Sequence, residues 1–251
     1  MTTPTTTDPA GRVINILQLA IKTPHQRSFL HFWANGFGLQ PDNVVEIYYN
    51  LGLFRDLVED VDRTIRQIPD IRHEQYLKAV DQLRTTIAQP NLQTAWNAHT
   101  RVLEMIINGL EFASERLQAH SPEPELPPSE LEAIRNQAAE LIQKLESSKT
   151  IPKRLKLILF DLLHGVQRSI DQYKFRGIRG VREEVFIIFS RIQEHYPDFA
   201  QSKDEPEVKG FFALLKKVDK ITAALLHVKE LIWIVAPLLP AIPTVIQHLL
   251  Q

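Results

Sequence analysis

The sequence predicts an all-α protein, a multi-helix bundle of about eight helices arranged in two halves. Apolar residues recur at spacings of three and four along most of the 251-residue chain, which is the pattern of helices that bury one face. Only 9 glycines are present, and no alternating strand pattern or Asn-Gly hairpin turn interrupts this spacing. A proline-rich stretch, residues 121–129, separates the two halves.

The first half, residues 12–120, is predicted to be helical throughout, after a polar segment, residues 1–11, that we expect to be a disordered tail. The longest helix of this half runs from Pro41-Asp42, where Asp42 is suited to cap it, to Pro69. The other predicted helices span residues 12–21, 25–34, 70–88 and 92–119. The apolar stripe of the longest helix is expected to consist of Val45, Tyr48, Tyr49, Leu53, Leu57, Val61 and Ile65.

Residues 121–129 are predicted to form an extended linker, because prolines are not accommodated inside a helix. Ser129 and Glu132 make a capping-box pair at the start of the next helix. Pro152 suits the first turn of a second helix, and Pro197 is expected to end a third. The helices predicted in the second half, residues 130–251, span residues 130–147, 152–174, 179–195 and 206–236.

An apolar segment, residues 231–250, reads LIWIVAPLLPAIPTVIQHLL and contains no Asp, Glu, Lys or Arg. Its length matches the roughly 20 residues that a transmembrane helix needs. Three prolines in it, at positions 237, 240 and 243, favour a broken or extended conformation instead. The lysines that precede it as a cytoplasmic flank would are Lys216, Lys217, Lys220 and Lys229. Contact with a membrane or a protein interface is expected of Leu231, Ile232, Trp233, Ile234, Leu238, Leu239 and Ile242.

The composition of the chain indicates its cellular compartment and the classes of partner that it can bind. The net charge of −1 gives no overall attraction to nucleic acid, and no nucleic-acid partner is expected. The chain has no cysteine, which suits a reducing compartment. Its N-terminal residues lack the basic and apolar regions of a secretory signal. We therefore expect a cytoplasmic protein that can associate with the inner membrane.

The sequence carries no motif of an enzyme. No Gly-rich phosphate loop, G-x-S-x-G motif or metal-ligand spacing among the 9 histidines is present, so we expect no catalysis, no cofactor and no metal. A magnesium-dependent hydrolase that uses Asp56, Glu59 and Asp60 on one helix face is the remote alternative. Solvated ion pairs explain this acidic cluster, which also includes Asp62, more simply. The pairs expected from i, i+4 spacing are Arg55–Glu59, Glu59–Arg63 and Asp62–Arg66.

A basic turn is the second feature of interest. Residues 121–148 carry six acidic and two basic residues, whereas residues 149–182 carry nine basic and two acidic residues. Near the end of the basic block, Gly177 and Gly180 can supply positive φ or a close approach. One interpretation is a structural turn, with arginines paired to Asp161, Asp171, Glu183 or Glu184. The other is a site for an anion or lipid headgroup formed by Lys174, Arg176, Arg179 and Arg182.

The segment IPKRLKLILFDLLHGVQRSIDQYKFRGIRGVREEV, residues 151–185, resembles a segment of uncharacterised bacterial helical proteins. In these proteins a helix ending in tyrosine meets an Arg-Gly-Ile-x-Gly turn, followed by a second helix and an apolar C-terminus. The resemblance extends over residues 130–251. Some of these proteins look like components of bacterial conflict or antiviral systems, and the resemblance implies such a role here.

Two functions are compatible with these features. In the first, a non-enzymatic helical protein engages or disrupts a membrane through residues 231–250, while the N-terminal half senses or restrains. In the second, a helical scaffold or adaptor uses the same residues as a core helix or as the interface of a homo-oligomer. The length of the apolar segment favours the first function, and its prolines favour the second.

Overall fold

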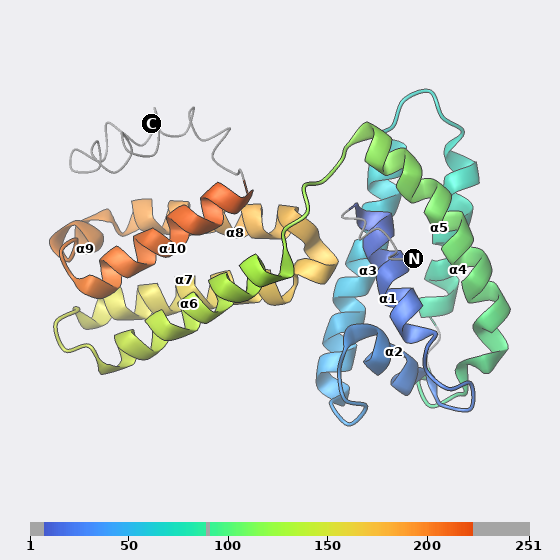
Figure 1. Ribbon diagram of the computed structural model, residues 1–251, viewed down its shortest axis with the longest axis horizontal. Helices are drawn as coiled ribbons and strands as arrows, with labels where there is room; N and C mark the ends of the chain where they lie inside the picture. Colours follow the sequence, from blue (N-terminus) through green and yellow to red (C-terminus); the bar gives the residue numbers. More distant parts are fainter. Residues whose placement is uncertain (1–7, 89–90, 223–251) are drawn as a thin grey trace. The chain divides into compact units, whose positions relative to one another are not determined.

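The computed structural model describes residues 8–88 and 91–222 (Figure 1). These residues form ten α-helices and one 3-10 helix, and their extended pairing is limited to an isolated bridge between Ser28 and Ala95. The all-α prediction is therefore confirmed. The whole apolar segment and the end of the predicted helix 206–236 lie outside the described residues.

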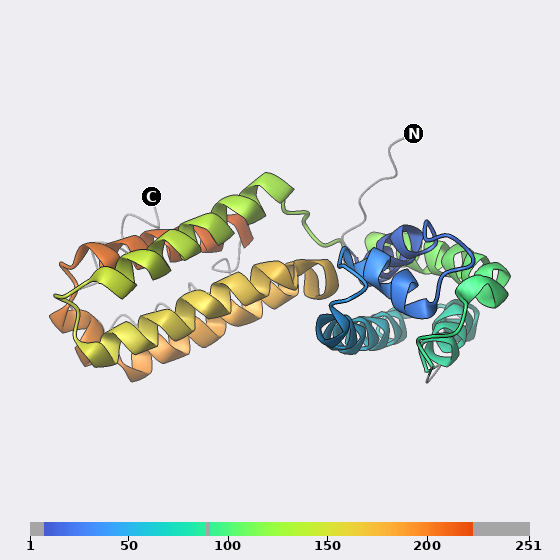
Figure 2. The same cartoon turned by 90° about the horizontal axis from the view of Figure 1, so that it is seen from below.

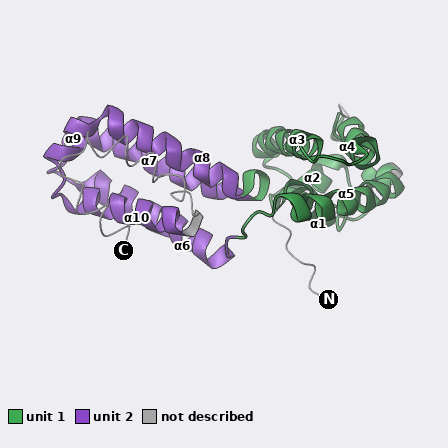
Figure 3. Cartoon of the chain, turned by 90° about the horizontal axis from the view of Figure 1, so that it is seen from above, with its two compact units in different colours: residues 1–125, 174–177 green, residues 126–173, 178–251 purple. Residues whose placement is uncertain are grey.

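The chain divides into two compact units, coloured separately in Figure 3. Unit 1 contains residues 1–125 together with residues 174–177, and unit 2 contains residues 126–173 and 178–251. The first boundary falls inside the stretch 121–129, where prolines interrupt helix formation. The insertion of residues 174–177 into unit 1 has no counterpart in the sequence prediction.

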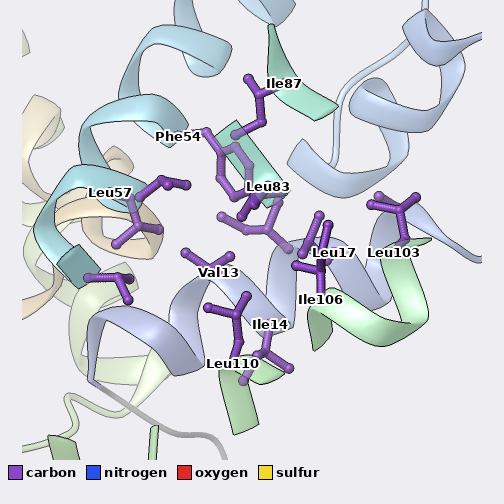
Figure 4. Packing of buried hydrophobic residues seen from close by; sticks show 14 of the residues in the cluster. Val13, Ile14, Leu17, Phe54, Leu57, Leu83, Ile87, Leu103, Ile106 and Leu110 are labelled. Carbon is purple, nitrogen blue, oxygen red and sulfur yellow. The ribbon is translucent and has the colours of Figure 1, made fainter. Parts of the chain in front are cut away.

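Unit 1 is built around α1, which packs against α2, α3 and α5, while α4 packs against α3 and α5. Its core gathers apolar side chains from all five α-helices, as the close view in Figure 4 shows for Val13, Leu17, Phe54, Leu83 and Ile106. The elements of unit 1 are α1 (Pro9–Ala20), α2 (Phe29–Phe37), α3 (Val44–Arg66), α4 (His73–Ile87), η1 (Trp96–His99) and α5 (Thr100–His120).

The first helix begins earlier than predicted, so residues 9–11 do not belong to a disordered tail. Asp8 is the N-cap of α1 and accepts a hydrogen bond from the Gly11 amide at 3.0 Å. Its other carboxylate oxygen accepts one from the Ser114 hydroxyl at 2.7 Å. Pro9 occupies the first turn, where a missing amide hydrogen is harmless. These caps fix the start of the helix.

The predicted apolar stripe of α3 is wrong over its first two turns. Val45, Tyr48 and Tyr49 are exposed, whereas Ile47 and Phe54 are buried. The helix begins at Val44, with Asn43 rather than Asp42 at the cap position. Apolar residues occur on two faces of these turns, so spacing alone could not select the face that meets the core. The side chains that form the buried stripe are Ile47, Leu51, Phe54, Leu57, Val58, Val61 and Ile65.

In unit 2, α6 packs against both α7 and α10. Figure 2 shows α6 (green) beside α10 (red) and α7 (yellow) beside α8 (orange). The Glu184 carboxylate of α8 lies over Gly165 of α7, in the space that a side chain at this glycine would fill. The elements of unit 2 are α6 (Pro128–Ser147), α7 (Lys153–Asp171), α8 (Tyr173–Glu194), α9 (Tyr196–Gln201) and α10 (Pro206–Thr222), and their apolar faces form one core.

Several predicted boundaries in the second half shift. The helix α6 begins at Pro128, so Ser129 lies in its first turn instead of capping it, and the linker is shorter than 121–129. The predicted helix 152–174 ends at Asp171. Pro197 lies in the first turn of α9 and does not end α8, which stops at Glu194. Proline at a helix start needs no amide donor, and the sequence alone does not distinguish this role from helix termination.

Candidate functional site

The basic turn is a bend inside α8. Gly177 has φ 57° and ψ −157°, and helical residues stand on both sides of it. This region of backbone space is nearly exclusive to glycine. Gly180, by contrast, lies within the helical part of α8, so the positive φ expected at one of the two glycines is found at Gly177.

Phe175 anchors residues 174–177 in the core of unit 1. Its side chain is 1% exposed, and its ring meets Phe37 edge to face at a centroid distance of 5.6 Å. The Lys174 ammonium donates a hydrogen bond of 2.6 Å to the Phe37 carbonyl and lies 5.1 Å from the centre of the Phe175 ring. Lys174 therefore serves packing within unit 1, which weakens its assignment to an anion site.

Arg12 of α1 completes the surroundings of this bend. Its guanidinium donates to the Phe175 carbonyl at 3.3 Å and forms an ion pair of 2.5 Å with Glu123. Both groups crowd the space where a side chain at Gly177 would lie. Buried ion pairs of this kind are costly to break once formed. The sequence analysis did not identify Arg12, because helical spacing carries no information about its contacts with Glu123 and Phe175, which lie more than 100 positions away.

The three arginines of the turn are not a free cationic cluster. Arg179 is exposed and pairs with Glu183 at 3.5 Å, one helical turn away. Arg176 and Arg182 are half-buried, and all three have interaction partners. Asp171 is bound instead by Arg135 at 2.9 Å. The Arg179–Glu183 pair agrees with the structural-turn interpretation of the sequence.

The acidic cluster of α3 is an ion-pair network. Asp62 pairs with Arg66 at 2.6 Å, as predicted. Glu59 is bound by Arg84 of α4 at 2.6 Å, and not by a hydrogen bond from Arg55 or Arg63. The Arg84 hydrogen bond lowers the pKa of the Glu59 carboxyl, and hydrogen bonding by Arg66 lowers the pKa of Asp62. Among the residues described, no three His, Asp or Glu side chains gather as metal ligands.

Lysines of α10 precede the apolar segment on an ordered helix. Lys216 and Lys220 are exposed and Lys217 is half-buried, while Lys229 lies outside the described residues. The spacing of Lys209, Lys216 and Lys220 places the three on one face of the helix. Within residues 8–88 and 91–222, no helix combines the length and the apolar character needed to cross a membrane.

The structure also brings together basic residues that the sequence reasoning treated as ordinary surface. Lys22, Arg27 and His31 line one pocket of unit 1, which we call the α1–α2 pocket. A signal for it exists in the sequence, because no Asp or Glu occurs from Pro9 to Pro41. Helical spacing does not reveal it, since two of the three residues lie in a loop.

Comparison with known proteins identifies no relative. A scan against protein-family models gives no match, and neither the curated proteins nor the solved structures contain a match. Arguments about function therefore rest on this chain's own residues.

Proposed function

We propose that this protein is a non-enzymatic helical protein whose apolar C-terminal segment, residues 231–250, binds a membrane. The observation that carries the proposal is the absence of Asp, Glu, Lys and Arg from twenty consecutive positions. Burial of such a segment in hydrocarbon or at the interface is favourable in proportion to its apolar area. The prolines at 237, 240 and 243 make an interfacial or broken insertion more favourable than one straight helix.

The lysine face of α10 supports the same proposal. Lys216 and Lys220 are exposed on one face, within fifteen positions of Leu231. Each basic side chain near an anionic leaflet contributes about 1 kcal/mol of attraction. An apolar segment next to a basic flank provides the two signals that stable membrane attachment requires.

Residues 130–251 resemble uncharacterised bacterial helical proteins, some of which look like components of bacterial conflict or antiviral systems, and this resemblance adds a biological role to the proposal. In that role the protein is a cytoplasmic effector that acts at the inner membrane, with unit 1 as the part that senses or restrains. This role rests on the proposed membrane binding, because the motif that carries the resemblance is short.

A second function, a scaffold or adaptor that forms homo-oligomers, is favoured by apolar surface in unit 2. On α8, Phe186 is 40%, Ile187 53% and Phe189 36% exposed. Leu157 of α7 is exposed as well. Clusters of exposed aromatic and aliphatic residues are typical of protein interfaces. If this function is correct, Phe186→Ser with Phe189→Ser converts an oligomer to a monomer in sedimentation velocity.

Vesicle flotation tests the membrane proposal with full-length proteins. The wild-type chain is expected to float with vesicles of phosphatidylcholine and phosphatidylglycerol, and Ile234→Glu with Leu238→Glu is expected to abolish flotation. The matched control is Val45→Glu with Met105→Glu, which adds two carboxylates at exposed apolar positions of unit 1. Circular dichroism checks that all three proteins are folded.

The lysines provide a second arm of the same experiment. Lys216→Gln with Lys220→Gln is expected to weaken flotation most with phosphatidylglycerol and least with pure phosphatidylcholine. The two substitutions remove only the electrostatic attraction between the lysines and an anionic lipid surface, and leave the apolar contribution of residues 231–250 unchanged. A folded wild-type chain that stays with the soluble fraction contradicts the proposal. So does a variant with two glutamates in residues 231–250 that floats as well as wild type.

A further inference from the structure

The α1–α2 pocket of unit 1 has the character of a ligand site. It is shallow and widely open to solvent, has a volume of about 540 Å³, and lies between the loop after α1, the side of α2 and the loop after α2. Small-molecule sites commonly have volumes of roughly 300–1,000 Å³. The polar side chains that line it are Lys22, Thr23, Arg27, His31, Asn35 and Gln40.

The charge of the pocket has one sign. Two permanently basic side chains and one histidine line it, and no Asp or Glu does. Neither Lys22 nor Arg27 forms an ion pair with any residue that the structure describes. The pocket lined by Arg66 and Lys78 differs, because Glu74 and Asp81 line it as well. Uncompensated positive charge in a concave surface attracts and concentrates anions.

Thr23 gives independent support for a ligand. Its side chain is 5% exposed, and its hydroxyl is buried without a hydrogen-bond partner. The Thr23 amide donates a hydrogen bond to the Ala20 carbonyl at 3.0 Å, so the hydroxyl is the polar donor of this residue that has no partner. Buried hydroxyls in folded proteins nearly always have a partner, and an unpaired one calls for an explanation. Thr23 lines the α1–α2 pocket, and a ligand oxygen that reaches its hydroxyl after a local shift of the loop would accept this hydrogen bond.

Hydrogen bonds hold parts of the pocket wall in place. The Pro24 carbonyl accepts hydrogen bonds from the Arg27 amide at 3.0 Å and from the indole of the buried Trp96 at 3.1 Å. Nδ1 of His31 is hydrogen-bonded to the Ser28 hydroxyl at 3.0 Å, which orients the ring. Gly38, in the left-handed region, ends α2 just before the lining residues Leu39 and Gln40. Preorganised walls reduce the entropy lost on binding.

We propose that the α1–α2 pocket binds the phosphate group of a small phosphomonoester. Arg27 and Lys22 supply charge-assisted donors, the Thr23 hydroxyl donates the buried hydrogen bond, and Asn35 or Gln40 can contact the organic part. The pocket has room for an organic group beside the phosphate. This inference does not depend on the membrane function proposed for residues 231–250.

Isothermal titration calorimetry of the full-length chain tests the proposal, with inorganic phosphate and glycerol 3-phosphate as probes. Both are expected to bind, and the double variant Lys22→Gln, Arg27→Gln is expected to lose at least tenfold in affinity for each. Lys78→Gln, an exposed lysine of α4 outside this pocket, is the matched control and retains wild-type affinity. Absence of binding by the wild-type chain, or equal affinity in the double variant, overturns the proposal.

Thr23→Val separates a ligand role from a structural one. The substitution removes the unpaired hydroxyl at nearly constant volume, so it is expected to raise the melting temperature of the ligand-free protein and to weaken phosphate binding at least threefold. Unchanged affinity in a folded Thr23→Val chain contradicts the role given to the hydroxyl and, with it, the site.

The phosphate could belong to a soluble metabolite or to a lipid headgroup, and vesicles of phosphatidic acid distinguish the two. This arm uses the full-length Ile234→Glu, Leu238→Glu chain, so that residues 231–250 do not contribute. Vesicle binding that disappears in the Lys22→Gln, Arg27→Gln background assigns the lipid as the source of the phosphate. Binding of glycerol 3-phosphate without such vesicle binding assigns the soluble ligand.

Discussion

Phe175 joins a segment of four residues to the core of unit 1. Its ring is buried against Phe37, and its carbonyl accepts a hydrogen bond from Arg12, whose charge is balanced by Glu123. The positive φ of Gly177 lets the chain leave this position immediately after the phenylalanine. A side chain at this glycine would meet the Arg12 guanidinium and the Glu123 carboxylate. Each of these residues is thus explained by its neighbours in unit 1, without a bound anion.

Phe175→Ala is expected to destabilise the protein by about 3–5 kcal/mol, because it removes a fully buried ring and leaves a cavity. The measurement is the free energy of unfolding in urea. Phe112→Ala is the control, since Phe112 of unit 1 is 65% exposed and its loss should cost less than about 0.5 kcal/mol. Equal and small effects of the two substitutions would show that Phe175 is not part of the core.

At the scale of elements, one close helix contact in unit 1 is made by a glycine. A methyl group at Gly109 of α5 would lie 2.6 Å from the Ala79 Cβ of α4, so the two helices are too close here to admit a side chain on α5. Gly52 of α3 has no atom within 4 Å of the corresponding position. The same substitution should therefore have opposite effects at the two glycines.

Gly52→Ala is expected to stabilise the protein by roughly 0.5–1 kcal/mol, the difference in helix propensity between the two residues. Gly109→Ala is expected to destabilise it by about 1–3 kcal/mol, since the helices must separate to admit the methyl group. Thermal unfolding of both variants measures the effects. A stabilising Gly109→Ala would mean that α4 and α5 are farther apart than described.

The helices α3 and α4 are also linked by the carboxylates around Arg84. Its guanidinium holds Glu59 at 2.6 Å and Asp62 at 3.3 Å, and these carboxylates in turn raise the pKa of Arg84. Because the pKa of Glu59 is lowered in the folded state from its usual 4.5, this group stabilises the fold above that pH. The contribution is lost as the pH falls through the lowered value.

Arg84→Met keeps most of the aliphatic packing and removes the charge. We expect it to cost about 1 kcal/mol at pH 7, a small figure because Glu59 is half exposed and solvent screens the pair. At pH 2.5 the cost should be smaller, since the attraction is lost as the carboxylates become protonated when the pH falls through their lowered pKa values. Urea unfolding at the two pH values is the measurement, with Arg101→Met of α5 as an exposed control. A cost independent of pH would exclude the carboxylates as its origin.

At the scale of the whole molecule, helical spacing predicted the fold class and the approximate position of most helices. It failed where two faces carry apolar residues, as in the first turns of α3, where Val45 and Tyr48 are exposed and Ile47 is buried. It also failed for contacts between distant positions. Phe175 in the core of unit 1 and the partnership of Arg12 with Glu123 depend on tertiary packing, which periodicity does not report.

Spacing in the sequence predicted the parts of the candidate sites that lie within one helix, and not the parts that depend on contacts between distant positions. An ion-pair network at the acidic cluster of α3 follows from spacing within one helix, but the part played by Arg84 of α4 does not. The basic turn is recognisable in the sequence because its arginines lie three residues apart. The α1–α2 pocket was not predicted, because Lys22 and Arg27 of the loop between α1 and α2 meet His31 of α2 only through the tertiary fold.

The three tryptophans offer a direct test of membrane binding. Trp33 and Trp96 are buried in unit 1, with 1% and 0% exposed. Trp233 belongs to residues 231–250, and tryptophan readily enters the membrane interface. The measurement is tryptophan fluorescence of the full-length chain with phosphatidylglycerol-containing vesicles whose acyl chains are brominated, compared with the same vesicles without bromine. Bromine is predicted to quench part of the emission of the wild-type chain and none of the emission of Trp233→Phe. Equal emission from a folded wild-type chain with both kinds of vesicle would contradict membrane binding by this segment.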